Sequence, residues 1–150
     1  MERLFSIAER VLLTLWVGGM WIVGYLVAPS LFVSLADRQL AGQLAGNIFS
    51  LMAWLGLACG AGLLLITLIR AGGNWLKAWR VWALVVMLVL VAVGLFVLQP
   101  YMQELKAQGL LAGSVQAAEF GRLHGVSSIL YLINSLLGLA LVVAGLRGQR

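Results

Sequence analysis

Short polar segments divide the chain into four long apolar runs, at about residues 8–35, 40–69, 79–99 and 115–146. A helix needs about 20 apolar residues to cross the hydrocarbon core of a bilayer, and each run is at least that long. The backbone polar groups of a spanning segment must be satisfied within the membrane, so each run is expected to be helical. The sequence therefore predicts an all-α integral membrane four-helix bundle, forming a single transmembrane domain over residues 1–150.

Two prolines affect the predicted helices. Pro29 is expected to kink the first helix near its far end, and Gln99-Pro100 is expected to end the third. Residues 101–118 then have the pattern of a short amphipathic helix followed by a turn at Gly113-Ser114. We therefore expect a short extra helix between spans three and four.

A cleaved signal peptide is an alternative interpretation of the first run, because Ser34-Leu35-Ala36 resembles a cleavage site. The run is too long for such a peptide, and Glu2 and Glu9 do not fit a basic leader. We expect a retained helix.

Basic residues indicate the orientation. With four spans, both termini share a side with the basic, tryptophan-containing segment 70–80. That side holds seven basic residues, which are Arg3, Arg10, Arg70, Lys77, Arg80, Arg147 and Arg150. The other side holds three, which are Arg38, Lys106 and Arg122. Because basic loops stay in the cytoplasm, we predict a multi-pass protein of the bacterial inner membrane, with cytoplasmic termini and a periplasmic extra helix.

Composition supports a lipid environment. Hydrophobic residues make up 63% of the chain and charged residues 10%, against about 25% charged in soluble proteins. The net charge of +5 does not indicate nucleic-acid binding, because the basic residues are spread thinly over helix ends. A single cysteine excludes an internal disulfide framework. The lipid bilayer is the expected partner, and the sequence leaves open a homo-oligomer or a partner in a membrane complex.

Two G-x-x-x-G pairs lie in the second run, Gly42/Gly46 and Gly56/Gly60. Small residues at this spacing let helix backbones approach closely in membranes. We expect these four glycines at helix–helix contacts.

The fourth run carries a polar stripe. At about 100° per residue, its polar and small positions fall within an arc of about 120°; they are His124, Ser127, Ser128, Tyr131, Asn134, Ser135 and Gly138. Such a stripe should face other helices, because an unpaired polar group in hydrocarbon is costly.

Other polar residues are expected at the same depth as the stripe, in the outer half of the membrane; they are Tyr25, Asn47 and Gln99. Polar groups gathered at one depth predict a ligand site or polar network that opens outward. In that case His124 should be partly buried and hydrogen-bonded to one of them. The alternative is that these groups only join helices, at about 0.6 kcal/mol each.

His124 is the only histidine. As a haem ligand it would need an open site or a second axial partner, which a homodimer could supply. As a soft-metal ligand it could join Met102, Met20 or Cys59, but no paired spacing such as C-x-x-C or M-x-x-M occurs. As a proton relay or structural donor it needs nothing further. No Ser/His/Asp set lies at membrane depth, so we expect no enzymatic activity, no metal centre and no cofactor.

The segment Phe120 to Ser128, FGRLHGVSS, resembles the F-x-x-x-H-G-x-S-S element of the transmembrane protein 205 family, whose bacterial members carry the domain of unknown function numbered 4149. Leu15 to Trp21 and Ala28 to Phe32 are similar to that family's first helix, and Leu44 to Phe49 to its second-helix entrance. The family is four-spanning and distantly similar to copper-resistance D membrane proteins. Because eukaryotic members are linked to tolerance of platinum drugs, the resemblance implies soft-metal handling.

The leading functional hypothesis is a small protein that binds or transports a small ligand or soft metal ion at an outward-facing polar site around His124. The second is a non-catalytic scaffold or accessory subunit of a membrane complex, in which the stripe only fixes packing. The third is a membrane haem b protein.

Overall fold

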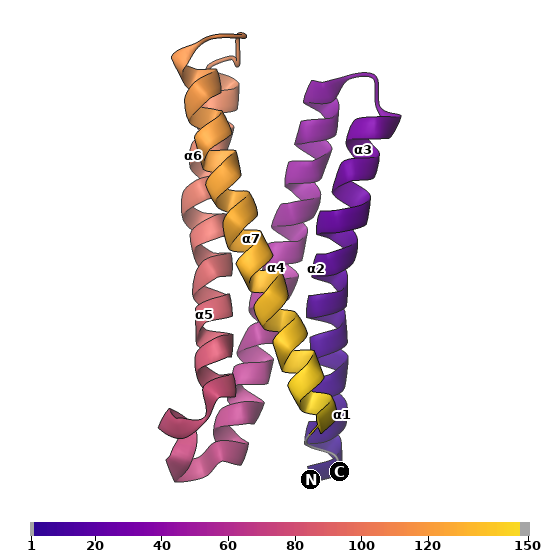
Figure 1. The fold of residues 1–150 in the computed structure, drawn as a ribbon, viewed down its shortest axis with the longest axis vertical. Coiled ribbons are helices and arrows are strands. Elements are labelled where there is room, and N and C mark those ends of the chain that lie inside the picture. The colour runs from indigo at the N-terminus through magenta and orange to yellow at the C-terminus, as the bar shows by residue number, and fades with distance from the viewer. Residues whose placement is uncertain (1, 148–150) are drawn as a thin grey trace.

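The computed structural model describes residues 2–147, and within them every regular element is helical. Four long helices lie side by side (Figure 1). All four are long and apolar enough to cross a membrane; they cover Glu2–Ser34, Arg38–Ala71, Trp79–Ala107 and Val115–Ala144. The chain therefore has the architecture of a multi-pass membrane protein.

The first and third long helices contain π-helical turns. The first consists of α1 (Glu2–Leu13), η1 (Thr14–Gly18), α2 (Gly19–Ile22), η2 (Val23–Val27) and α3 (Ala28–Ser34). The third consists of α5 (Trp79–Val93), η4 (Gly94–Leu98) and α6 (Gln99–Ala107). The second is α4 (Arg38–Ala71) and the fourth is α7 (Val115–Arg147), while the short 3₁₀ segment η3 (Gly72–Lys77) joins α4 to α5.

Pro29 and Pro100 each lie in the first turn of an α-helical segment that follows a π turn. A proline lacks an N–H and its ring crowds the carbonyl four residues earlier, and a wider π turn relieves both problems. The predicted end of the third helix at Gln99-Pro100 is therefore wrong. Of the segment expected to hold the extra helix and turn, residues 101–107 are the end of this long helix, residues 108–114 form the connection, and residues 115–118 begin α7.

Side-chain caps fix where two long helices begin. Asp37 Oδ1 accepts hydrogen bonds from the backbone N–H of Gln39 at 2.8 Å and of Leu40 at 3.1 Å, which starts α4. Ser114 Oγ accepts from the N–H of Ala117 at 3.1 Å just before α7. Both are N-caps that satisfy otherwise free amides in the first helical turn.

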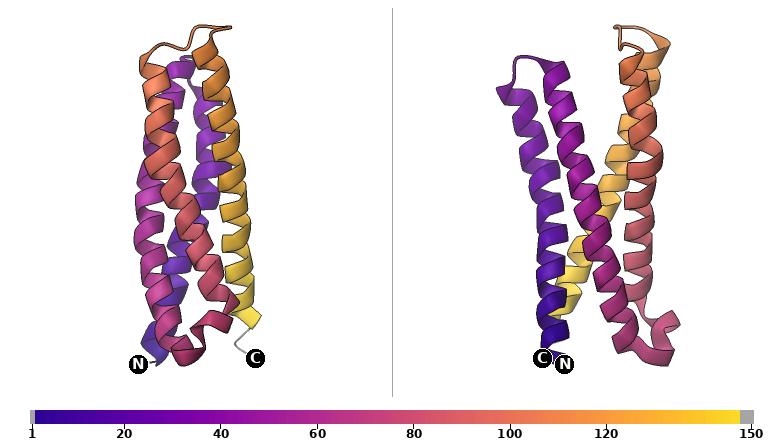
Figure 2. Two further views of the ribbon diagram at one scale, coloured as in Figure 1. Left: turned by 90° about the vertical axis from the view of Figure 1, so that its left-hand side faces the viewer. Right: turned by 180° about the vertical axis from the view of Figure 1, so that it is seen from behind.

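The bundle has two different ends. The terminus end holds the start of α1, the end of α7 and η3; the loop end holds connections 35–37 and 108–114 (Figure 1). At the loop end α3 packs on α4 and α6 packs on α7. Figures 1 and 2 show that these two pairs diverge toward the loop end. Arg150, part of the charge asymmetry in the sequence, lies outside the described residues.

The core is built on a tryptophan that fits against two glycines. Trp16 of η1 is buried, and a Cβ placed on Gly56 would lie 2.6 Å from its Nε1. A Cβ on Gly60 would lie 2.7 Å from Trp16 Cζ3 and 2.6 Å from Leu88 Cδ2. These two glycines let the first and second helices approach each other closely. Gly42 and Gly46 meet no such neighbour, since the nearest atom is Phe32 Cζ at 4.0 Å from a Cβ on Gly42.

The predicted orientation gives a labelling experiment. In a Cys59→Ala background, a cysteine at Gln108 on the loop end should react with an impermeant thiol reagent added to intact spheroplasts. A cysteine at Leu76, which is exposed in η3, should react only after lysis. The reason is that basic segments are retained in the cytoplasm. The reverse pattern would contradict the orientation.

Candidate functional site

The polar face of α7 meets the first long helix near the middle of the bundle. Tyr131 Oη donates to the carbonyl oxygen of Met20 at 2.6 Å. Tyr25 Oη and Ser135 Oγ are hydrogen-bonded at 2.8 Å, and Trp21 Nε1 donates to the carbonyl of Ser135 at 3.4 Å. We call this contact the α2–α7 seam. It joins helices more than a hundred residues apart in sequence.

Local sequence explains why the tyrosine fits. The Tyr131 ring lies against Gly24, at the position that a Cβ would occupy. On its other side, the ring of Phe49 from α4 meets it edge-on, with centroids 5.2 Å apart at 88°. Tyr131 therefore fixes the first, second and fourth long helices together.

Asn134 is the buried amide of the seam, with 3% of its surface exposed. Its Nδ2 lies 3.4 Å from Met20 Sδ, a weak acceptor. Its Oδ1 is buried and has no hydrogen-bond partner among the described residues. The seam is thus a packing contact with one polar atom left over.

His124 lies outside the seam. It is seven residues before Tyr131, which puts it on nearly the same face of α7, about 10 Å nearer the loop end. Its side chain is exposed, and its ring stacks on Phe120 with centroids 6.0 Å apart at 11°. The structure does not bring His124 to Tyr25, Asn47 or Gln99, and the expected hydrogen bond to one of them is not present among the described residues.

The remaining predicted residues are spread over the half of the bundle nearer the loop end. Ser128 Oγ donates to the carbonyl of His124 at 2.8 Å, within its own helix, and Ser127 is half-buried. Gln99 Nε2 donates to the carbonyl of Gly46 at 3.3 Å. Asn47 is exposed. Similar depth therefore did not make these residues neighbours.

Lys106 joins the two helix pairs at the loop end. Its Nζ lies 3.4 Å from the carbonyl oxygen of Gly42 and 5.3 Å from the centre of the Phe120 ring. The backbone carbonyl oxygens of Gly42 and Gly46 thus accept hydrogen bonds from Lys106 and Gln99 of the third long helix. Sequence reasoning missed Lys106 because the third helix was expected to end before it.

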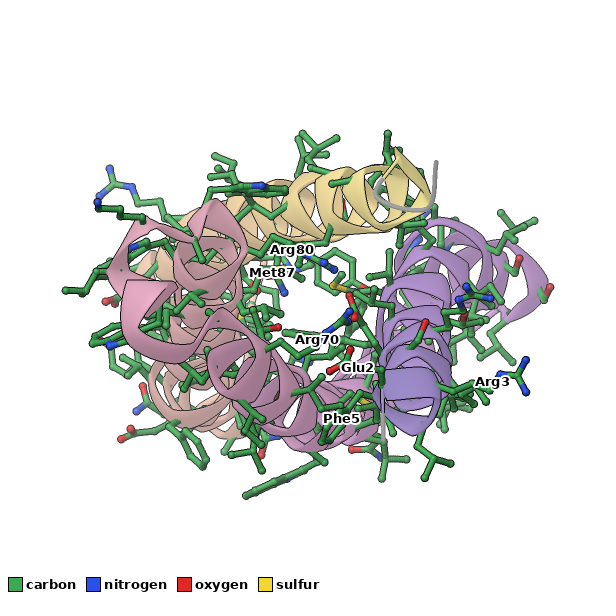
Figure 3. All side chains as sticks on the ribbon, turned by 90° about the horizontal axis from the view of Figure 1, so that it is seen from below. Glu2, Arg3, Phe5, Arg70, Arg80 and Met87 are labelled. Carbon is green, nitrogen blue, oxygen red and sulfur yellow. The ribbon has the colours of Figure 1, made fainter. Side chains whose placement is uncertain are left out.

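A cluster of charges ties α1 to the ends of α4 and α5. Arg70 Nη1 donates to Glu9 Oε2 at 2.9 Å, Arg80 Nη2 donates to Glu9 Oε1, and Arg70 Nη2 lies 3.5 Å from Glu2 Oε2. Viewed from the terminus end, Arg70 and Arg80 point between the helices whereas Arg3 points away (Figure 3). The signal in the sequence was the presence of Glu2 and Glu9 on the same predicted side as the basic segment 70–80.

The family of the chain follows from its first three helices. The family model described as Domain of unknown function (DUF4149) matches residues 11–110, two thirds of the chain. The chain belongs to the DUF4149 family. Comparisons with curated proteins and with solved structures gave no match.

The match to the DUF4149 model ends before α7, so Phe120 and His124 lie outside it. Among the described residues of this DUF4149 protein, no group of three or more His, Cys, Asp or Glu side chains is placed to hold a metal ion. Cys59 is a buried free cysteine in the core. The His124 ring and the Lys106 ammonium both contact the Phe120 ring.

Proposed function

We propose that this DUF4149 protein is a small bacterial inner-membrane protein, with cytoplasmic termini, that binds a small ligand between its helix pairs at the periplasmic loop end. His124 is the residue that contacts the ligand. The role is binding, or transport that begins with binding, and not catalysis. One observation carries the proposal, which is that the polar face of α7 changes character with depth.

In the seam, Tyr131 and Ser135 of that face are hydrogen-bonded across to the first long helix. Two turns nearer the loop end, His124 has an exposed ring. An imidazole can both donate and accept hydrogen bonds, which helix packing alone does not require. The seam therefore holds the bundle, while His124 is free to meet a ligand.

The contrast between the two ends supports a transport-related role. Ion pairs join α1, α4 and α5 at the terminus end, and the helix pairs diverge at the loop end (Figures 1 and 3). Transporters that work by alternating access also move one helix bundle against another around the binding site, which requires the two ends to differ.

A scaffold or accessory subunit is the second candidate, favoured by the hydrogen bonds of the seam, since polar groups that join helices are ordinary membrane packing. Soft-metal handling, which the resemblance to the transmembrane protein 205 family implies, has one supporting contact, the thioether of Met20 beside Asn134. Thioethers are ligands for soft ions such as Cu(I).

Native mass spectrometry of protein extracted directly from membranes tests the proposal. The parent protein should carry a bound small molecule, and His124→Ala should lose it while retaining the parent's thermal stability, because the ring makes no hydrogen bond to any described residue. Arg122→Ala is the matched control, because Arg122 is exposed on α7 two residues away. It should keep the bound molecule.

A variant His124→Ala with the same adduct as the parent would contradict the proposed site and favour the scaffold. An absorbance spectrum of the same sample, with a Soret band present, would instead support a haem protein.

A further inference from the structure

Lys106 is a positive charge without a negative partner. No carboxylate lies within ion-pair distance of its Nζ among the described residues; its contacts are the Gly42 carbonyl at 3.4 Å and the face of Phe120. The side chain is half-buried and lies within a helix apolar enough to span a membrane. A charge held away from water without a counter-ion is unfavourable, and polar groups of this kind mark ligand sites in membrane proteins.

The nearby acids are engaged elsewhere or solvated. Asp37 caps α4, and Glu119 accepts a hydrogen bond from Tyr101 Oη at 2.7 Å. Glu104 is exposed near the end of α6. The terminus end is different, since Glu9 accepts from both Arg70 and Arg80. The protein therefore neutralises its partly buried charges at one end and leaves Lys106 unneutralised at the other.

Phe120 links this charge to His124. The ammonium lies over the Phe120 ring, and the His124 ring stacks on the same residue. Lys106 of α6 and His124 of α7 thus both contact one aromatic side chain. Both groups donate hydrogen bonds to anions, and a positive charge beside the imidazole repels a metal cation.

An exposed apolar side chain lies near this polar pair. Phe32 of α3 lies beside Gly42, whose carbonyl accepts the Lys106 hydrogen bond. The Phe32 side chain is 43% exposed. His124 of α7 is also exposed. An anion with an apolar chain would match both parts of this environment.

We propose that Lys106 and His124, which both contact Phe120, bind the carboxylate of a single-chain amphiphilic anion, with its apolar chain between the helix pairs. The ligand class deepens the proposed function and rests on it. Lys106 supplies the charge, His124 a directed hydrogen bond, and Phe120 holds both side chains in place.

Electron paramagnetic resonance of a spin-labelled stearate tests this proposal. The protein is reconstituted in phosphatidylcholine bilayers at a pH where the stearate carboxyl is ionised, and its methyl ester is the uncharged comparison probe. The parent should bind stearate about fivefold more tightly than the ester, which corresponds to one favourable charge contact near a membrane surface. Lys106→Gln should remove this preference, and Lys106→Arg should keep it.

Lys77→Gln is the matched control, since it removes the same charge at the exposed terminus end and should leave the preference unchanged. Excess acetate should not displace stearate if the apolar chain of stearate contributes to binding. Displacement would mean that the site binds any free carboxylate, and it would contradict the proposal of an amphiphilic ligand. Equal binding of stearate and ester by the parent, or an unchanged preference in Lys106→Gln, would overturn the anion site. The proposed function is tested separately, by whether His124→Ala loses the bound small molecule in native mass spectrometry.

Discussion

Gly60→Leu is expected to lower the free energy of unfolding by about 3 kcal/mol, at the upper end of the range for overpacking. The first added carbon alone would lie 2.6 Å from Leu88 Cδ2 and 2.8 Å from Trp16 Cη2. Trp16 is itself almost fully buried, with 1% of its surface exposed, so it has little room to move. Unfolding in mixed micelles with increasing dodecyl sulfate would measure the change.

Gly46→Leu is the matched control, because it adds the same side chain to the same helix at a glycine with no neighbour within 4 Å. It should be close to neutral, or slightly stabilising from the higher helix propensity of leucine. Equal stability of Gly60→Leu and the parent would show that α4 does not pack against Trp16 in this way.

Glu9→Gln is the second change with a large expected effect, a loss of about 2–3 kcal/mol. The Glu9 side chain is 12% exposed and accepts hydrogen bonds from two guanidinium groups. The amide cannot balance their charge, and it can accept through one oxygen only. Removal of the carboxylate therefore leaves Arg70 and Arg80 without their shared counter-ion, in a position where Arg80 already has a buried Nε without a partner among the described residues.

Glu2→Gln provides the comparison within the same cluster. Its side chain is 76% exposed and lies 3.5 Å from Arg70, so the pair is solvated and contributes about 0–1 kcal/mol. In the same dodecyl sulfate titration, the free energy of unfolding of Glu9→Gln should be well below that of Glu2→Gln. Equal losses for the two variants would mean that burial of Glu9 has no influence on the strength of the cluster.

Much of the fold could be predicted from the apolar runs, because a spanning helix has few alternatives in a bilayer. The exception was the end of the third helix. Pro100 was interpreted as a stop, yet it lies in the first turn of α6 after a π turn, where it is tolerated. The sequence carries no strong local signal for a π turn, so the extension to Ala107 could not be predicted.

The polar stripe was predicted on the correct helix, but its neighbours depended on helix packing. Tyr131 and Asn134 contact the first helix, whereas His124, on nearly the same face, is exposed and stacks on Phe120 of its own helix. Depth along a helix follows from residue number, but the direction that a helix faces, and its tilt, do not. For the same reason two identical G-x-x-x-G pairs differ in role: one accommodates Trp16, and the other presents carbonyls to Gln99 and Lys106.

The most direct test of the central claim is a density map of the native protein, purified with its bound lipids and small molecules. A ligand site at the loop end predicts ordered non-protein density between the helix pairs, in contact with the imidazole of His124 and the ammonium of Lys106. A well-resolved map in which both groups meet only protein side chains, with no density between the pairs, would contradict a ligand site at this position.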